Sequence, residues 1–246
     1  MLTFLGSGGA FNTNLGNTSA YFELGKELFL IDCGEDVFSK LINKGVLNQK
    51  SRVNIFITHL HSDHVGSLGT LIAYLYFKVF RQDMSNICVY FPSQSICDFL
   101  LLQGVSRKWY NFFENKWDEL YIPGFNKLPE YSFIDCNHTD ALNYKGTVNT
   151  FSLEFIVHNQ FSFYYSGDTS QFDKRLHNYS LYDAIYHEVT SLTGTGVHME
   201  YSMLIDETKN WPLEERKKIY LMHLDEQFDT EKAMKDGFSI VVNETN

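Results

Sequence analysis

The sequence predicts an α/β protein, and three observations support that class. Short apolar runs that are typical of strands alternate along the chain with longer stretches of helical periodicity. Polar, potentially metal-binding residues follow several of these runs directly, as HLHSDH (59–64) follows 53–58. A length of 246 residues suits one large domain with a sizeable core. We therefore expect a single α/β domain over residues 1–246, with its chemistry in loops at strand ends.

The strands and helices are expected in the following order. Residues 2–5 form a strand that ends in Gly6, Ser7, Gly8 and Gly9, where a glycine loop could hold a phosphate or make a tight turn near other backbone. Residues 19–24 and 27–31 alternate like a hairpin around Gly25 and Lys26. Further strands are expected at 53–58, 87–91, 131–136, 152–158, 161–166 and 218–222, and helices at 36–44, 68–80 and 93–102.

The charge, the cysteines and the apolar runs of the chain argue against some classes of protein. The formal net charge is −10 and the pI is about 5.3, whereas tight binding to a phosphate backbone needs a broad basic surface. A large nucleic-acid partner is therefore disfavoured. Four cysteines, Cys33, Cys88, Cys97 and Cys136, form no CxxC pattern and no disulfide scaffold. Without a signal peptide or a membrane-length apolar run, we expect no membrane association and a cytoplasmic protein.

HLHSDH is the stretch around which the predicted site is organised. In extended backbone, side chains two residues apart point the same way, so His59 and His61 can bind one metal ion. Asp63 and His64 lie beyond the turn and can face a second ion. The alternative is a set of solvated loop histidines. Because the chain has only nine histidines, three of them within six residues beside an aspartate favour the metal site.

Further potential ligands follow other strands. His138, Asp168 and His223 each come after an apolar run. Their repetition at strand ends indicates, together with HLHSDH, two adjacent metal sites. Nitrogen and oxygen ligands without sulfur suit zinc and tolerate manganese or iron. Asp32 also ends a strand, and it either orients a ligand histidine or caps the helix at 36–44.

Two aromatic stretches have alternative interpretations. For residues 68–80, burial of a helix in the core explains the aromatic side chains more simply than a base-stacking surface. Residues 104–123 interleave aromatic rings with Arg107, Lys108 and Lys116. Such a stretch can stack on bases or form a buried dimer contact, and we favour the dimer contact.

These residues resemble the five-motif signature of the metallo-β-lactamase superfamily, with Asp32 in the first motif. The resemblance implies a four-layer αββα sandwich and two metal ions. It places His59, His61 and His138 on one ion, Asp63, His64 and His223 on the other, and Asp168 as a bridge between the ions.

The phosphodiesterase branch of the superfamily matches best. No cysteine lies at a ligand position, unlike the typical dizinc β-lactamase, and His61 stands where flavodiiron proteins have an acid. FLGSGGA (4–10), LIDCGE (30–35) and SGDT (166–169) resemble ribonuclease Z. Glu188 and His198 match the acid and the histidine that act near the leaving group in that branch, although His198 taken alone could be a surface histidine.

Ribonuclease Z carries a transfer-RNA-binding arm between the motifs of His138 and Asp168, which here are only 30 residues apart. Compact, armless relatives are the anti-Pycsar phosphodiesterases of phages and bacteria, homodimers in which a partner segment helps to close over the substrate. Residues 104–123 are a candidate for that segment. The resemblance implies hydrolysis of cyclic mononucleotides (cCMP, cUMP, cAMP, cGMP) to 5′-monophosphates in the cytoplasm, which is the host cytoplasm if a phage encodes the protein. It also implies two Zn²⁺ ions (or Mn²⁺ or Fe).

In that mechanism Asp63 orients the attacking water, and His198, held by Glu188, protonates the leaving oxygen. The alternatives are a ribonuclease Z-like RNA 3′-processing endonuclease and a metal-bound protein that sequesters a nucleotide without hydrolysing it.

Overall fold

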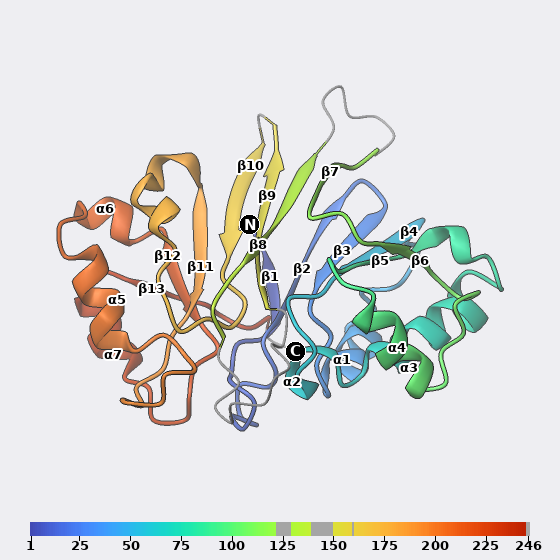
Figure 1. Cartoon of the computed structure of the whole chain (residues 1–246), viewed down its shortest axis with the longest axis horizontal. Coiled ribbons are helices and arrows are strands. Elements are labelled where there is room, and N and C mark those ends of the chain that lie inside the picture. The colour runs from blue at the N-terminus through green and yellow to red at the C-terminus, as the bar shows by residue number, and fades with distance from the viewer. Residues whose placement is uncertain (122–128, 139–149, 159, 245–246) are drawn as a thin grey trace. The chain divides into compact units, whose positions relative to one another are not determined.

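The computed structural model describes residues 1–121, 129–138, 150–158 and 160–244. These residues form two compact units (Figure 1). The N-terminal unit comprises Leu2–Lys116 with residues 243–244, and the C-terminal unit comprises Met1 with the described part of Trp117–Val242. Each unit contains one sheet. No helix among the described residues is long and apolar enough to span a membrane.

The N-terminal unit contains a six-stranded sheet whose strands follow one another in chain order. The first three strands are antiparallel, and from β3 onward neighbouring strands are parallel. The strands are β1 (Thr3–Gly6), β2 (Ser19–Leu24), β3 (Glu27–Ile31), β4 (Arg52–Phe56), β5 (Ile87–Tyr90) and β6 (Asn111–Phe113). The helices are α1 (Val37–Asn43), α2 (Ser62–Val65), α3 (Leu68–Tyr74), which continues as a π-helix at Leu75–Val79, a 3₁₀ turn at Met84–Asn86, and α4 (Ser95–Leu102).

The C-terminal unit contains a seven-stranded sheet in the order β13-β12-β11-β10-β9-β8-β7. Strands β7 to β10 form an antiparallel meander, and β10 to β13 pair in parallel. The strands are β7 (Trp117–Glu119), β8 (Glu130–Asp135), β9 (Phe151–Val157), β10 (Phe161–Tyr165), β11 (Ala184–Glu188), β12 (Ile219–Met222) and β13 (Ser239–Ile240). The helices are 3₁₀ turns at Lys174–His177 and Tyr179–Leu181, α5 (Tyr201–Thr208), α6 (Leu213–Arg216) and α7 (Thr230–Lys235).

The hairpin predicted at 19–24 and 27–31 is confirmed residue for residue. The other expected strands lie within two residues of their predicted ends. The sequence analysis missed β6, β7, β11 and β13, and it missed helices α2 and α5 to α7. Among these, β11 matters most because Glu188 is its last residue.

The glycine-rich stretch after β1 is a tight turn. A Cβ atom added to Gly6 would collide with the backbone carbonyl of Asn17, and one added to Gly8 would press on the carbonyl of Asn12. Gly8 also pairs with Asn17 as an isolated bridge. Backbone packing therefore explains these glycines, in agreement with the simpler of the two interpretations.

The stretch 68–80 divides into buried aliphatic residues and less buried aromatic ones. Leu68, Leu71, Ile72 and Leu75 are fully buried, whereas Tyr74, Tyr76 and Phe80 are half-buried and Phe77 is 48% exposed. Core burial therefore explains the aliphatic residues, and as an explanation of the aromatic side chains the core interpretation is wrong. Within the stretch 104–123, the Trp109 ring lies 5.6 Å from that of Tyr76 and 5.0 Å from that of Phe77. The Arg107 guanidinium lies 4.9 Å from the Tyr110 ring centre. Residues 122 and 123 of the stretch lie outside the described residues.

Candidate metal centre

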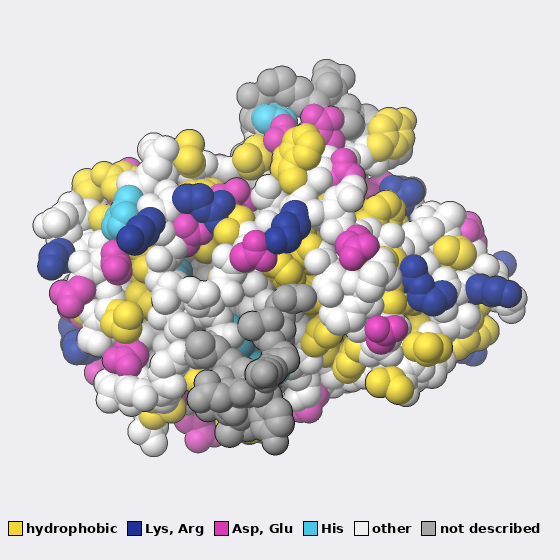
Figure 2. Space-filling view, viewed as in Figure 1, with side chains coloured by type: hydrophobic (Ala, Val, Ile, Leu, Met, Phe, Trp, Pro, Cys, Tyr) yellow, Lys and Arg dark blue, Asp and Glu magenta, His cyan; other side chains and the backbone are white. Residues whose placement is uncertain are grey.

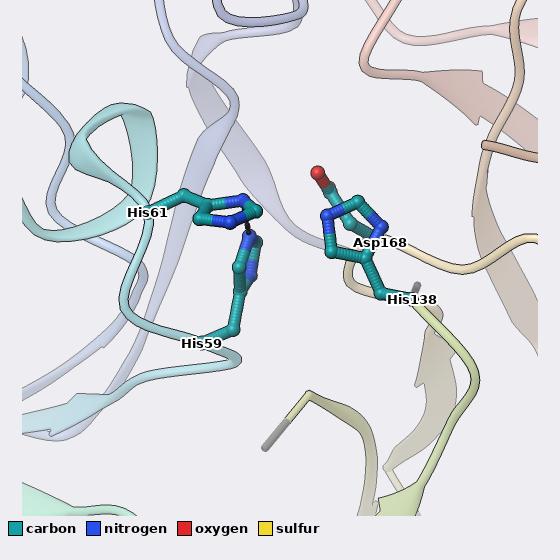
Figure 3. Close-up of side chains that lie close together, drawn as sticks. All are labelled: His59, His61, His138 and Asp168. Carbon is teal, nitrogen blue, oxygen red and sulfur yellow. Dashed lines mark hydrogen bonds between the residues drawn. The ribbon is translucent and has the colours of Figure 1, made fainter. Parts of the chain in front are cut away.

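His59 and His61 lie in the loop between β4 and α2. His59 is fully buried whereas His61 is exposed. Nε2 of His59 lies 3.0 Å from Nδ1 of His61, and Figure 3 shows the two nitrogens facing each other. Two imidazole nitrogens that share one tetrahedral zinc ion at its usual bond length lie roughly 3.3 Å apart. The pair is therefore spaced as two ligands of one ion require.

Asp32 holds His64 in one orientation. Oδ2 of Asp32 lies 2.8 Å from Nδ1 of His64, so Nδ1 carries the proton and donates it. The other ring nitrogen, Nε2, lies 3.3 Å from Oδ2 of Asp63. The Thr58 amide (2.8 Å) and hydroxyl (2.9 Å) also donate to the buried Asp32 carboxylate. Burial raises the pKa of Asp32, and His64 acts in the opposite direction.

Asp32 does not cap the first helix. Helix α1 begins at Val37 and its N-cap residue is Asp36, so the helix-cap interpretation of Asp32 is wrong. The Asp32 carboxylate instead accepts hydrogen bonds from Thr58 and His64. This contact is what a residue that orients a ligand histidine would make.

Asp32 and His223 both adopt backbone conformations that L-residues rarely adopt. Their φ angles are 60° and 56°, in the left-handed region. Each comes directly after a strand, β3 or β12. Strained residues of this kind concentrate at functional sites, where the surrounding structure keeps them in place. The strain supports a site at each of the two strand ends.

In the C-terminal unit, His138 and Asp168 follow β8 and β10 (Figure 3). Nδ1 of His138 donates to the carbonyl oxygen of Val197 at 3.0 Å, which leaves Nε2 as the nitrogen available for a metal ion. Asp168 is 2% exposed, and its Oδ2 lies 3.5 Å from Nε2 of His223.

Glu188 and His198 form the shortest ion-pair contact in this cluster. Nδ1 of His198 lies 2.7 Å from Oε2 of Glu188 and 3.8 Å from Oδ2 of Asp168. Oε2 of Glu188 also lies 3.6 Å from Nδ1 of His223. Burial and then the neighbouring Asp168 raise the pKa of Glu188, while His198 lowers it. One potential ligand atom from each of four residues lies within 4.8 Å of those of the other three: Asp168, Glu188, His198 and His223.

Asp225 contacts a neighbouring loop of the candidate site, and the sequence analysis missed it. It accepts hydrogen bonds from the Thr190 hydroxyl (3.0 Å), the Ser191 amide (2.6 Å) and hydroxyl (2.8 Å), and the Gln227 amide (3.0 Å). Thr190 begins the loop that leads to His198, and it pairs with Glu200 as an isolated bridge. Asp225 thus joins the His223 loop to the His198 loop. The available signal was an aspartate shortly after a strand-end histidine, the pattern already noted in HLHSDH.

The donor set fits a divalent cation that prefers nitrogen and oxygen ligands. Cys136 is the nearby sulfur, and its Sγ donates to the backbone oxygen of Asp168 at 3.4 Å. Burial raises the pKa of the Cys136 thiol to about 12. Cys136 belongs to none of the groups of described side chains whose atoms are spaced to share a metal ion. Imidazole and carboxylate groups remain, as the sequence predicted.

Solved structures with similar folds define the class of protein. YhfI from Bacillus subtilis, a metallo-β-lactamase fold protein, aligns with a TM-score of 0.70 at 18% identity over 98% of this chain and 95% of that one. The short form of human tRNase Z aligns with a TM-score of 0.65 at 18% identity, covering 98% and 96% of the two chains. The metallo-β-lactamase fold expected from the sequence is confirmed. Among the described residues, His, Asp and Glu side chains form clusters spaced to hold a metal ion, so the protein is one of this fold with a candidate metal site.

The sequence comparison identifies the family within that class. The model of the family described as anti-Pycsar protein Apyc1 matches residues 1–246, so the chain belongs to that family. A curated relative, the anti-Pycsar protein Apyc1 of Bacillus phage vB_BveM-Goe7, is 28% identical over 244 residues, covering 90% of this chain and 88% of the relative. The expected relationship to the anti-Pycsar proteins is thus confirmed.

Proposed function

We propose that this protein is a binuclear zinc phosphodiesterase that hydrolyses cyclic mononucleotides to nucleoside 5′-monophosphates. The observation that carries the proposal is the contact of His198 with the buried Glu188, beside Asp168 and His223, in a chain of the anti-Pycsar family. A protein that only binds a nucleotide has no need for a histidine poised to donate a proton. Removing such a nucleotide would counteract an antiphage defence that signals with it.

The ligand assignment follows the superfamily pattern. His59, His61 and His138 would hold one ion, Asp63, His64 and His223 would hold the other, and Asp168 would be a ligand shared by both. The hydrogen bonds at Nδ1 of His64 and His138 support it, because each leaves Nε2 for a metal ion. Zinc suits these ligands, and manganese or iron is the alternative.

Divalent ions held by such ligands lower the pKa of water and neutralise charge on the phosphoryl oxygens. Asp63 accepts a proton from the attacking water and orients it toward phosphorus. His198 donates a proton to the departing ribose oxygen. Glu188, hydrogen-bonded to Nδ1 of His198, keeps the proton on that nitrogen and turns the other ring nitrogen toward the substrate.

Surface charge favours a small substrate over a large RNA. The formal net charge is −10, and Figure 2 shows Lys and Arg side chains interspersed with Asp and Glu among the described residues of the face in view. A long phosphate backbone would require a broad basic surface. A single cyclic phosphodiester carries one negative charge, which metal ions held by these ligands would offset.

Four further expectations remain proposals. We propose one functional domain over residues 1–246, a homodimer, a place in the host cytoplasm, and a role for residues 104–123 in the dimer contact or in closing over the substrate. Light scattering of the purified protein tests the homodimer, and a monomer would exclude it.

A competition between substrates tests the proposed function against RNA processing. Metal-loaded protein would be incubated with cCMP, cUMP, cAMP and cGMP together with a transfer-RNA precursor, with and without a chelator. We expect loss of the cyclic nucleotides, intact RNA, and inhibition by the chelator. Cleavage of the RNA with survival of the cyclic nucleotides would instead support the ribonuclease Z-like alternative.

A further inference from the structure

The C-terminal unit contains a group of four potential metal ligands that the proposed ion assignment uses only in part. The group consists of Asp168, Glu188, His198 and His223, and one potential ligand atom of each lies within 4.8 Å of those of the other three. Asp168 and His223 belong to the proposed ligand set of the two ions. Glu188 and His198 belong to neither ion in that assignment, because they are proposed to deliver a proton. The group therefore offers two further metal-binding side chains.

The spacing of these atoms suits one small divalent ion. Two ligand atoms of a tetrahedral zinc ion at its usual bond lengths lie roughly 3.3 Å apart. Oε2 of Glu188 lies 2.7 Å from Nδ1 of His198 and 3.6 Å from Nδ1 of His223. Nδ1 of His198 lies 3.8 Å from Oδ2 of Asp168. Small movements of the side chains would therefore bring these atoms to the spacing that zinc requires.

The Glu188 carboxylate presents one oxygen to the group and uses the other elsewhere. Its Oε1 accepts a hydrogen bond from the Thr169 amide, whereas Oε2 is the oxygen that lies near both histidines. The side chain is fully buried. Burial and then the nearby Asp168 raise the pKa of Glu188. A divalent cation among these atoms would offset the repulsion between the two buried carboxylates.

We propose that Glu188 and His198, with Asp168 and His223, form an inhibitory zinc site, an inference that rests on the proposed function. Zinc at this site binds Nδ1 of His198, the nitrogen that donates to Glu188 in the proposed proton donor. A metal ion and a proton compete for the same nitrogen. With zinc on Nδ1, His198 cannot be the doubly protonated imidazolium that supplies a proton to the leaving oxygen.

The inhibitory ion is the weaker one to bind, because Asp168 and His223 are shared with the proposed ligand sets of the other ions. Dialysed protein therefore keeps His198 ready for proton transfer, and only excess zinc fills the inhibitory site. Magnesium prefers oxygen ligands and retains its bound waters. Excess magnesium should therefore not bind to this pair of imidazoles.

Zinc uptake tests the site without any measurement of activity. By isothermal titration calorimetry, dialysed wild-type protein should bind one equivalent of zinc beyond what it retains on dialysis. His198→Ala and Glu188→Gln should each bind that equivalent at least about tenfold more weakly. His177→Ala is the matched control, because His177 and Glu207 form an exposed histidine–carboxylate pair at 3.5 Å. Circular dichroism would confirm that the variants are folded.

Two results would overturn the site. One is wild-type protein that takes up no such equivalent. The other is equally tight uptake by wild type, His198→Ala and Glu188→Gln, or loss of the equivalent in His177→Ala, since either outcome would place the ion elsewhere.

Kinetics tests the inhibition. Excess zinc should lower the wild-type kcat for cCMP toward that of His198→Ala, a decrease of about 10²–10⁴-fold, and excess magnesium should not. The residual rate of His198→Ala should not respond to excess zinc, which controls for effects of zinc on the substrate. An unchanged wild-type kcat with the additional equivalent bound would overturn the inhibitory role.

Failure of the proposed function would be recognised separately. If the wild type hydrolysed no cyclic nucleotide, the phosphodiesterase proposal would fall, and the inhibitory role would fall with it. The comparison of zinc uptake needs no substrate and would still decide the site. Weaker uptake in His198→Ala and Glu188→Gln than in His177→Ala would support it, and equal uptake in all the proteins would exclude it.

Discussion

Nδ1 of His198 lies 2.7 Å from Oε2 of Glu188, and the Glu188 carboxylate is fully buried. The contact fixes the imidazole of a half-buried histidine, which we propose as the proton donor to the leaving oxygen. Positioned acids of this kind contribute about 10²–10⁴-fold to a rate.

The first prediction concerns this pair. His198→Ala should lower kcat by about 10²–10⁴-fold and leave the metal content unchanged, because His198 is proposed as a proton donor and not as a ligand. Steady-state kinetics and elemental analysis measure the two quantities. His177→Ala is the control, since His177 is exposed and pairs with Glu207. An unchanged kcat would remove His198 from the mechanism.

The second prediction concerns Asp225, which joins the loops of His198 and His223. Asp225→Ala removes the acceptor of four hydrogen bonds and should lower kcat by about tenfold to a hundredfold through misplacement of His198. Asp225→Asn keeps one carbonyl acceptor and should recover part of the rate. Asp206→Ala, at a 79% exposed side chain, is the control. Equal kcat in Asp225→Ala and wild type would show that the loops hold their positions without this residue.

The third prediction concerns Gly34, which lies in the LIDCGE motif two residues after Asp32. A Cβ atom added here would collide with the backbone carbonyl of Asp63. Gly34→Ala should therefore displace HLHSDH, weaken metal binding and lower the free energy of unfolding by about 1–3 kcal/mol. Gly25→Ala is the comparison. Gly25 has a φ of 63° but no atom near an added Cβ, so that variant should lose stability and bind metal normally. Normal metal affinity in Gly34→Ala would contradict the account.

The fourth prediction concerns the buried His187. Burial lowers its pKa to about 4 from 6.5, and its Nε2 has no hydrogen-bond partner among the described residues. Between these values the unfolded chain binds a proton that the folded chain does not. Stability is therefore full above pH 6.5 and falls by about 3 kcal/mol as the pH drops to 4.

His187→Phe should flatten that decline, because phenylalanine does not titrate and can stack on Phe172 as His187 does. Urea unfolding of the metal-free proteins across this pH range measures the difference. The same acid dependence in the variant and the wild type would show that other groups cause it.

Much of the fold could be predicted because most strands carry local signals. The 19–24 and 27–31 hairpin alternates in a clear period of two residues, and it was located residue for residue. Strand β11 was missed because it is central, with parallel neighbours on both sides, and buried at all five positions. Its buried His187 and Glu188 interrupt the apolar run that would have revealed it. Burial of these two polar groups depends on tertiary contacts that no short window of sequence contains.

Residues of the candidate site, like the strands, could be predicted only where the signal was local in the sequence. His59, His61, Asp63 and His64 were found because their spacing lies within six residues. Asp32, which contacts His64, was found because it also ends a strand. The partners that hold His138 and the His198 loop could not be found by spacing. Val197, which fixes the tautomer of His138, is 59 residues away in sequence, and Asp225 lies 35 residues from Thr190. Such partners follow from the order of strands in the sheet, which brings distant loops to one edge.

The most direct test of the central claim is the product formed from cCMP by the metal-loaded protein, resolved by chromatography over time. The account predicts conversion to cytidine 5′-monophosphate, abolished by a chelator and restored by added zinc or manganese. Persistence of cCMP in the metal-loaded protein, or hydrolysis that the chelator leaves unchanged, would contradict a metal-dependent cyclic-nucleotide phosphodiesterase.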